Sequence, residues 1–102
     1  MSDKKKIYIS GPITGVDDYL ENVKKAECKW KLRGYIVVNP ARILKEMPEE
    51  TTYEEYMEIA MKLLSMCDSI YMMNGWEQSR GANREYGYAL ADEIEIWKEE
   101  SK

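Results

Sequence analysis

Short apolar runs alternate with longer segments of helical periodicity along the first part of the chain. The run 7–9 is followed by the turn residues 10–12, which predicts a buried strand and then a loop. From 16 to 30, apolar positions recur at the spacing of one helix face, and Gly34 supplies the stop. A second strand is predicted at 35–38. The apolar helix positions are Val16, Tyr19, Leu20, Val23, Ala26 and Trp30.

The rest of the chain continues this alternation. The polar segment that ends at Glu50 has no clear period and is predicted to be a surface loop. Thr52 and Glu55 fit a capping box, which predicts a helix running to about Cys67. Residues 69–73 form the third predicted strand.

Ser79 is a good N-cap for a further helix, which carries Glu85. The alternating pattern at 94–97 favours a half-exposed last strand, with a continued helix as the alternative. Strands that alternate with helices indicate parallel βαβ units with right-handed crossovers. We therefore expect residues 1–102 to form a single α/β domain: a small doubly wound, flavodoxin- or Rossmann-like parallel sheet with helices on both faces.

In such sheets, ligands bind outside the carboxyl ends of the strands. The polar, glycine-bearing or proline-bearing segments 11–15, 39–40 and 75–81 all follow predicted strands. We expect these three loops to meet at one edge of the sheet, which is where functional residues are sought.

The composition excludes several classes of function. The formal net charge is -4, and no basic surface for a nucleic acid polymer is evident. The chain has no histidine, which excludes Ser-His-Asp and Cys-His catalysis and the common zinc sites. Cys28 and Cys67 match no metal or redox motif and are expected to be reduced packing residues, which suits a cytoplasmic protein. No signal peptide or membrane span is recognisable.

Glu85 interrupts an apolar helix face. A carboxylate on that face is partly desolvated, so it requires hydrogen-bond donors, such as Tyr8 on a neighbouring strand, or it has a catalytic role. The alternative is that Glu85 turns to solvent or pairs with Arg80 or Arg84. The apolar residues of the face are Ala82, Tyr86, Ala89 and Leu90.

The amino end of the same helix is a candidate anion site. With Ser79 as N-cap, the first turn offers unpaired N–H groups and the positive end of the helix dipole, and Gly81 allows close approach. The alternative interpretation is an ordinary capped helix start.

Taken in order, these motifs resemble the nucleoside 2-deoxyribosyltransferase-like superfamily. The chain is more closely similar to a compact bacterial and phage family in that group, related to 2'-deoxynucleoside 5'-monophosphate N-hydrolases. The resemblance covers nearly the whole chain. The segments that carry it are 8–15 (YISGPITG), 39–40 (NP), 67–68 (CD) and 75–89 (GWEQSRGANREYGYA).

The resemblance implies chemistry at an N-glycosidic bond, with no cofactor and no metal. Glu85 matches the glutamate that attacks the anomeric carbon of the sugar and releases the base, and Tyr8 supports this nucleophile. The glycosyl group then passes to another base in the transferases or to water in the hydrolases. The expected partner is a small nucleotide or nucleoside, without nucleic acid polymer or membrane.

The resemblance also implies substrate contacts in the loops. Ser79 stands where the monophosphate hydrolases have a serine that helps hold the 5'-phosphate, which favours a nucleotide. Trp76 is a candidate for stacking on the base, with a lid on the core or a subunit contact as its alternative. The implied substrate-binding residues are Gly11, Pro12, Ile13, Gly15, Asn39, Asp68, Trp76, Ser79, Gly81 and Ala82.

Two alternatives remain open at this stage. The related enzymes carry a second carboxylate where this chain has Ala60, which favours a non-catalytic module that binds a nucleotide or phosphosugar. A small oligomeric protein-interaction domain, anchored by Trp76, Tyr53 and Tyr56, is the other alternative. A homo-oligomer is expected by resemblance and because so small a sheet leaves apolar helix surface to cover.

Overall fold

The computed structural model describes residues 4–12 and 19–100, which form a four-stranded parallel sheet with the strand order β2-β1-β3-β4. The predicted α/β doubly wound fold is confirmed. The strands are β1 (Lys6–Ser10), β2 (Ile36–Val38), β3 (Ser69–Met72) and β4 (Glu95–Lys98). The helices are α1 (Tyr19–Leu32), α2 (Pro40–Ile43), α3 (Tyr53–Ser65) and α4 (Arg80–Ala91), and two short 3-10 helices are η1 (Leu44–Glu46) and η2 (Trp76–Gln78).

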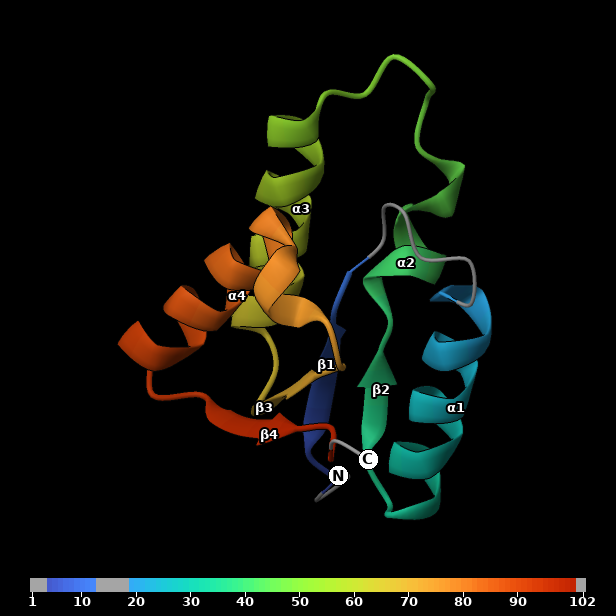
Figure 1. Ribbon diagram of the computed structural model, residues 1–102, viewed down its shortest axis with the longest axis vertical. Coiled ribbons are helices and arrows are strands. Elements are labelled where there is room, and N and C mark those ends of the chain that lie inside the picture. The colour runs from blue at the N-terminus through green and yellow to red at the C-terminus, as the bar shows by residue number, and fades with distance from the viewer. Residues whose placement is uncertain (1–3, 13–18, 101–102) are drawn as a thin grey trace.

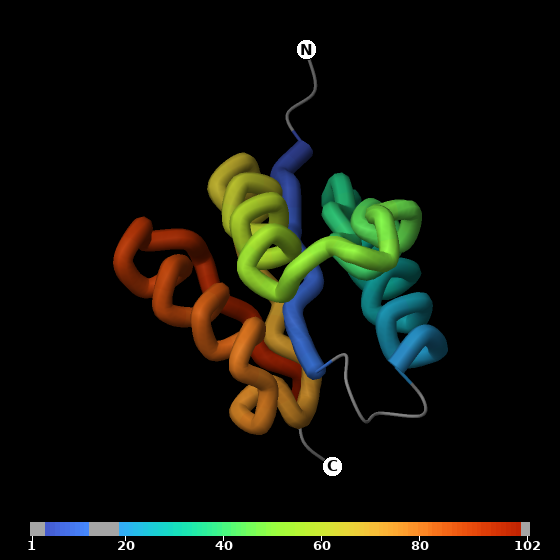
Figure 2. Tube along the Cα trace, turned by 90° about the horizontal axis from the view of Figure 1, so that it is seen from above, coloured from blue at the N-terminus to red at the C-terminus, as the bar shows by residue number. Residues whose placement is uncertain are grey.

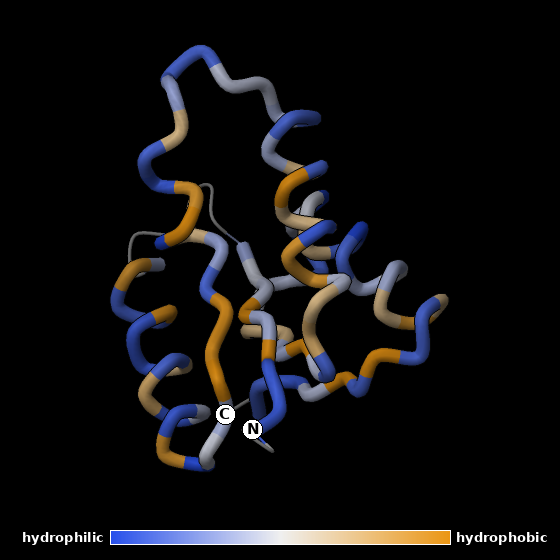
Figure 3. Tube along the Cα trace, turned by 180° about the vertical axis from the view of Figure 1, so that it is seen from behind, coloured by the Kyte–Doolittle hydropathy of each residue, from blue (hydrophilic) through white to orange (hydrophobic). Residues whose placement is uncertain are grey.

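Helices cover both faces of the sheet, with α1 on one side and α3 and α4 on the other (Figures 1 and 2). Side chains alternate along β1, so Ile7 and Ile9 pack with α1, whereas Tyr8 packs with α3 and α4. Figure 3 shows a continuous apolar stretch along β2, at one edge of the sheet. The core on the α1 side contains Ile7, Ile9, Val23, Ala26, Trp30, Tyr71 and Met73. The core on the other side contains Tyr8, Ala60, Leu64, Cys67, Ile70, Met72, Ala82 and Ala89.

Because all four strands are parallel, their carboxyl ends lie together at one end of the sheet, which we call the carboxyl edge. β1 lies at the centre, where Tyr8 is paired with Val38 of β2 and Ile70 of β3. Because β2 and β3 lie on opposite sides of β1, the direction of the winding reverses there. The carboxyl edge beside β1 is therefore the topological switch point.

Local sequence signals set most of the element boundaries. The capping box is confirmed: Glu55 N donates to Thr52 Oγ1 at 3.1 Å, and Thr52 N donates to the Glu55 carboxylate at 2.8 Å. Ser79 is confirmed as the N-cap of α4. The last segment is a strand at the edge of the sheet, so its prediction as a strand is confirmed and the continued-helix alternative is wrong.

Some predictions were wrong in detail. The polar segment before Glu50 contains α2 and η1, because Pro40 pre-organises a first turn and the side chain of Asn39 caps it. Leu20 and Leu90 are 74% and 57% exposed, because each lies off the line where its helix meets the sheet. Cys67 is buried as expected, whereas Cys28 is exposed.

Candidate active site

Glu85 is buried between α4 and the sheet, with only 7% of its surface exposed. The Tyr8 hydroxyl donates a hydrogen bond to Glu85 Oε2, and the Ser10 hydroxyl donates to Glu85 Oε1 at 2.6 Å. Tyr8 is fully buried and Ser10 is 2% exposed. Both oxygens of one buried carboxylate are therefore held by neutral hydroxyl groups from the same strand.

The sequence of α4 explains this placement. Glu85 is three residues after Ala82 and four before Ala89, and all three side chains are buried against the sheet. The small alanine side chains on either side allow the helix to approach the sheet closely. The alternative in which Glu85 pairs with an arginine is not what the structure shows: Arg80 and Arg84 instead lie 3.9 Å and 3.2 Å from Glu54 of α3.

Burial dominates the electrostatics of the site. It raises the pKa of Glu85, and the hydrogen bonds from Ser10 and Tyr8 offset part of that effect. Burial, followed by the charge of Glu85, raises the pKa of Tyr8 far above its usual range, so Tyr8 stays protonated as a donor. The same two causes raise the pKa of Tyr19, at the start of α1, to about 12.

Glu27 of α1 offers an internal comparison, because it is also 7% exposed. It lies 2.7 Å from Lys31 Nζ and 3.0 Å from Arg42 Nη1, and Asn39 Nδ2 donates to it at 3.1 Å. Burial acts to raise the pKa of Glu27, but these hydrogen bonds and cations outweigh it and lower the pKa. Nearby cations thus neutralise the charge of Glu27, whereas the donors to Glu85 among residues 4–12 and 19–100 are uncharged.

The loops after β1 and β3 meet at the carboxyl edge. A Cβ on Gly11 would lie 2.7 and 2.9 Å from Cε and Cβ of Met73, so any larger residue there would require Met73 to shift. Gly75 has a φ of +88°, and a Cβ on it would lie 3.3 Å from Pro12 Cγ. The predicted site residues Gly11 and Pro12 therefore lie against the loop that leads to α4. Ile13 and Gly15 lie outside the described residues.

At the amino end of α4, Ser79 is half-buried and its hydroxyl accepts a hydrogen bond from Ala82 N at 3.2 Å. Ala82 is 2% exposed and belongs to the core. A Cβ on Gly81 would lie 3.3 Å from Met57 Sδ, so this glycine permits close packing of α3 on α4. Ser79, Gly81 and Ala82 thus have a structural part in capping and packing α4, and their contact with a ligand stays a prediction.

Trp76 is half-buried and stacks at a tilt on Tyr86 of α4, with ring centroids 4.6 Å apart. The ammonium group of Lys98 lies 5.6 Å from the Trp76 ring and 5.3 Å from the Tyr86 ring. Part of the Trp76 surface is therefore already occupied by the protein, as expected of a residue that helps cover the core.

Two predicted site residues lie apart from Glu85. Asn39 follows β2 at the carboxyl edge, but its side chain donates to Glu27 and accepts from Arg42 N. Asp68 precedes β3 and accepts a hydrogen bond from Lys6 N at 2.9 Å. It therefore lies at the amino ends of the strands, away from the carboxyl edge. Neither side chain is brought to Glu85 in this structure.

Ser10 was not among the predicted site residues, although it contacts Glu85 directly. The sequence alone suggests a turn residue after a short strand. The signal that could have identified it is the alternation along β1, which places Ser10 on the same face as Tyr8. Ala60 lies in the core with Tyr8 and is 5% exposed, so the place expected for a second acid is apolar.

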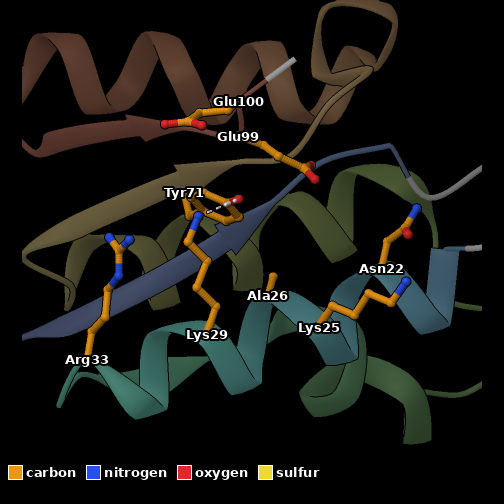
Figure 4. A pocket seen from close by; sticks show the side chains of 8 residues that line it. All are labelled: Asn22, Lys25, Ala26, Lys29, Arg33, Tyr71, Glu99 and Glu100. Carbon is orange, nitrogen blue, oxygen red and sulfur yellow. Dashed lines mark hydrogen bonds between the residues drawn. The ribbon is translucent and has the colours of Figure 1, made fainter. Parts of the chain in front are cut away.

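A separate hollow of about 320 Å³ lies on the α1 side of the sheet (Figure 4). Lys29 Nζ crosses it to within 3.4 Å of the Tyr71 hydroxyl. Tyr71 packs with α1, on the face opposite Glu85, so this hollow is not part of the Glu85 site. The lining residues are Asn22, Lys25, Ala26, Lys29, Arg33, Tyr71, Glu99 and Glu100.

Across residues 4–12 and 19–100, no group of three or more His, Cys, Asp or Glu side chains could hold a metal ion. None of the helices in these ranges is long and apolar enough to span a membrane.

The chain belongs to the family described as "Domain of unknown function (DUF4406)", whose model matches residues 5–98. Among solved structures it is similar to a 2-deoxyribosyltransferase from Bacillus psychrosaccharolyticus, with a TM-score of 0.74 and 18% sequence identity. The match covers 91% of this chain and 70% of that enzyme. At this identity the likeness establishes the fold, which is nucleoside 2-deoxyribosyltransferase-like as the motifs suggested. No curated protein sequence matched the chain.

Proposed function

We propose that this member of the family acts at the N-glycosidic bond of a small deoxynucleotide or deoxynucleoside, with Glu85 as the nucleophile. The observation that carries the proposal is a buried carboxylate at the switch point of the sheet whose donors are the neutral hydroxyls of Tyr8 and Ser10. A buried charge without a cationic partner is costly, and such groups are concentrated at functional sites. The similar fold of a deoxyribosyltransferase supports this reaction class by analogy.

The proposed reaction is a double displacement. A Glu85 oxygen attacks the anomeric carbon of the sugar, and the bond from that carbon to the base nitrogen breaks. The base leaves with the electron pair and takes a proton from solvent. Water then attacks the same carbon and gives up a proton to solvent, and the bond from that carbon to the Glu85 oxygen breaks, which releases the sugar and restores the Glu85 carboxylate; in a transferase, a second base takes the place of water.

The surroundings of Glu85 suit this role. Burial raises the pKa of Glu85, so its carboxylate is more basic than an exposed one. Burial also keeps away water, which would otherwise hydrate the carboxylate and make it a poorer nucleophile. Tyr8, which stays protonated, orients the carboxylate without donating a full charge to it. The step needs no cofactor or metal.

The amino end of α4 supports a 5'-phosphate as part of the substrate. Ser79 caps this helix about 1.7 turns before Glu85, and the first N–H groups of a helix favour an anion. Gly11 and Pro12 would line the sugar on the side of β1, and Trp76 would line the base.

We further propose a homo-oligomer, because three apolar residues on or next to α3 and α4 are exposed to solvent. Their exposed fractions are 40% for Tyr53 of α3, 51% for Met66 just after α3 and 57% for Leu90 of α4.

A second candidate is a non-catalytic module that binds the same ligands. The apolar position of Ala60 in the core favours it, because the related enzymes have a second acid there. Loss of a general acid or base typically costs on the order of 10²–10⁴ in rate. The two candidates differ in whether a base is released, not in what is bound.

The experiment that tests the proposal follows free base by chromatography for a panel of deoxynucleoside 5'-monophosphates and deoxynucleosides. The wild type is compared with Glu85→Gln and with the control Glu27→Gln, which changes a glutamate of the same exposed fraction on the other side of the sheet. We expect release by the wild type and the control and a loss of about 10³-fold or more in Glu85→Gln. Release that survives in Glu85→Gln would contradict the nucleophile. Saturable binding without release by any variant would favour the binding module.

A further inference from the structure

The sheet fixes the backbone of Ser10, so its hydroxyl can occupy few positions. It is the last residue of β1, it is paired with Met72 of β3, and its carbonyl oxygen accepts a hydrogen bond from Met73 N at 2.8 Å. Its side chain lies on the Tyr8 face of the strand and is 2% exposed. Only rotation about the Cα–Cβ bond remains to it. The strand therefore fixes the position of the Ser10 hydroxyl.

This hydroxyl contacts the oxygen of Glu85 that Tyr8 does not contact. Tyr8 donates to Oε2 and Ser10 donates to Oε1 at 2.6 Å, a short distance typical of a hydroxyl bonded to a charged oxygen. A carboxylate held at one oxygen can still rotate about its last bond. A second donor on the other oxygen fixes its plane.

The two donors are not equivalent. Tyr8 is fully buried and belongs to the same core cluster as Ala60 and Leu64. Ser10 directly precedes Gly11 at the carboxyl edge, where the proposed substrate binds. At Glu27, Lys31 and Arg42 balance the charge of the carboxylate. At Glu85, the hydroxyls of Tyr8 and Ser10 take the place of such cations. A cation at Glu85 would weaken it as a nucleophile, whereas a hydroxyl stabilises the charge and leaves it in place.

We propose that Ser10 is a positioning residue for Glu85: its hydroxyl fixes the plane of the carboxylate and sustains its negative charge where Glu27 uses cations. This rests on the proposed function in so far as the ionised Glu85 is the group that attacks. In agreement, the Ser10 hydrogen bond lowers the pKa of Glu85 against the larger upward effect of burial.

The test compares Ser10→Ala with Ser69→Ala. Ser69 is a matched control, because it is a buried strand serine whose hydroxyl also donates to a glutamate, Glu95, at 2.9 Å. In Ser10→Ala we expect kcat at neutral pH to fall about tenfold or more, and the acid limb of the pH profile to move to higher pH. Ser10→Thr, which keeps the hydroxyl, should retain the wild-type limb. Ser69→Ala should leave the limb unchanged.

A second measurement needs no activity. The carboxyl carbon of Glu85 is followed by NMR over a pH titration in protein labelled at glutamate, and its signal is assigned by its loss in Glu85→Gln. We expect the titration midpoint to rise in Ser10→Ala and not in Ser69→Ala. If Ser10→Ala does not fold, Ser10→Cys has a side chain of similar size and a weaker donor, and the midpoint should rise there too.

These outcomes separate the two proposals. An unchanged midpoint in the Ser10 variants overturns the role of Ser10, whatever the activity. A raised midpoint together with a shifted acid limb supports it. If the wild type releases no base from any substrate, the proposed function fails, and the NMR titration still decides whether Ser10 holds the charge of Glu85.

Discussion

Replacing Tyr8 with phenylalanine removes one hydroxyl from a fully buried ring and leaves its shape unchanged. The lost hydrogen bond goes to a carboxylate that is itself only 7% exposed, so water cannot readily replace it. Hydrogen bonds to charged groups contribute roughly 1.5–3 kcal/mol. We therefore expect Tyr8→Phe to lower the free energy of unfolding by about 2 kcal/mol at neutral pH. For a domain of this size that lowers Tm by roughly 8–16 °C.

The effect should depend on pH in a defined direction. The Tyr8 hydrogen bond favours the ionised form of Glu85 and acts to lower its pKa, so Tyr8→Phe raises the pKa of Glu85 further. The loss of stability is then full above the raised pKa, where Glu85 is ionised in the folded state. It shrinks as the pH falls through that pKa, because the carboxyl is protonated in both proteins.

Urea unfolding followed by circular dichroism, repeated across pH, measures both quantities. Tyr71→Phe is the matched control, since Tyr71 is a buried tyrosine on the neighbouring strand whose hydroxyl lies 3.4 Å from Lys29 Nζ instead of a carboxylate. Its unfolding free energy should change by less than about 1 kcal/mol, with little pH dependence. A Tyr8→Phe protein within about 0.5 kcal/mol of the wild type at neutral pH would refute the reasoning.

Three further substitutions test other parts of the structure. Thr52→Ala removes the capping box with Glu55 and should lower the free energy of unfolding by about 1 kcal/mol in urea titrations while base release is kept; an unchanged midpoint would mean that the cap is dispensable. Gly11→Ala forces a methyl group to within 2.7 Å of Met73 Cε and should cost about 1–3 kcal/mol in the wild type, but less in a Met73→Ala background, which lacks Cε; an equal cost in both backgrounds would argue against this contact as the cause. Glu85→Gln should be more stable than the wild type above the raised pKa of Glu85. Folding raises that pKa, so wild-type stability falls as the pH rises from the ordinary glutamate range through the folded value, and the variant lacks this loss; a constant difference across pH would count against it.

The parts of the fold that local sequence determines were predictable. The apolar run around Tyr8, closed by turn residues, and the helical spacing around Glu85 identify a strand and a helix that share a buried interface. The caps at Thr52 and Ser79 are local hydrogen bonds, so the residues themselves indicate them. From these features the sequence predicted the α/β class and helices on both faces of the sheet, and it offered Tyr8 as one candidate donor to Glu85, which the structure confirms.

What the sequence could not supply depends on distant parts of the chain. Helix α2 has no apolar period, and its cap, Asn39, is held by Glu27 of α1, twelve residues earlier. Ser10 resembles a turn residue until α4, some 75 residues later, brings Glu85 to it. The exposure of Leu90 follows from which side of α4 meets the sheet: Ala82, Glu85 and Ala89 are buried, and Leu90 lies to one side of that line.

The central claim is that Glu85 forms a covalent bond with the sugar, and trapping that bond tests it most directly. A deoxynucleotide with fluorine at C2' is suitable, because the fluorine destabilises the oxocarbenium-like centre and slows breakdown of the glycosyl-enzyme. Mass spectrometry of the intact protein should show the mass of one fluorinated sugar phosphate, located on the peptide that contains Glu85 and absent from Glu85→Gln. An adduct on another residue, or base release without any adduct, would contradict the account.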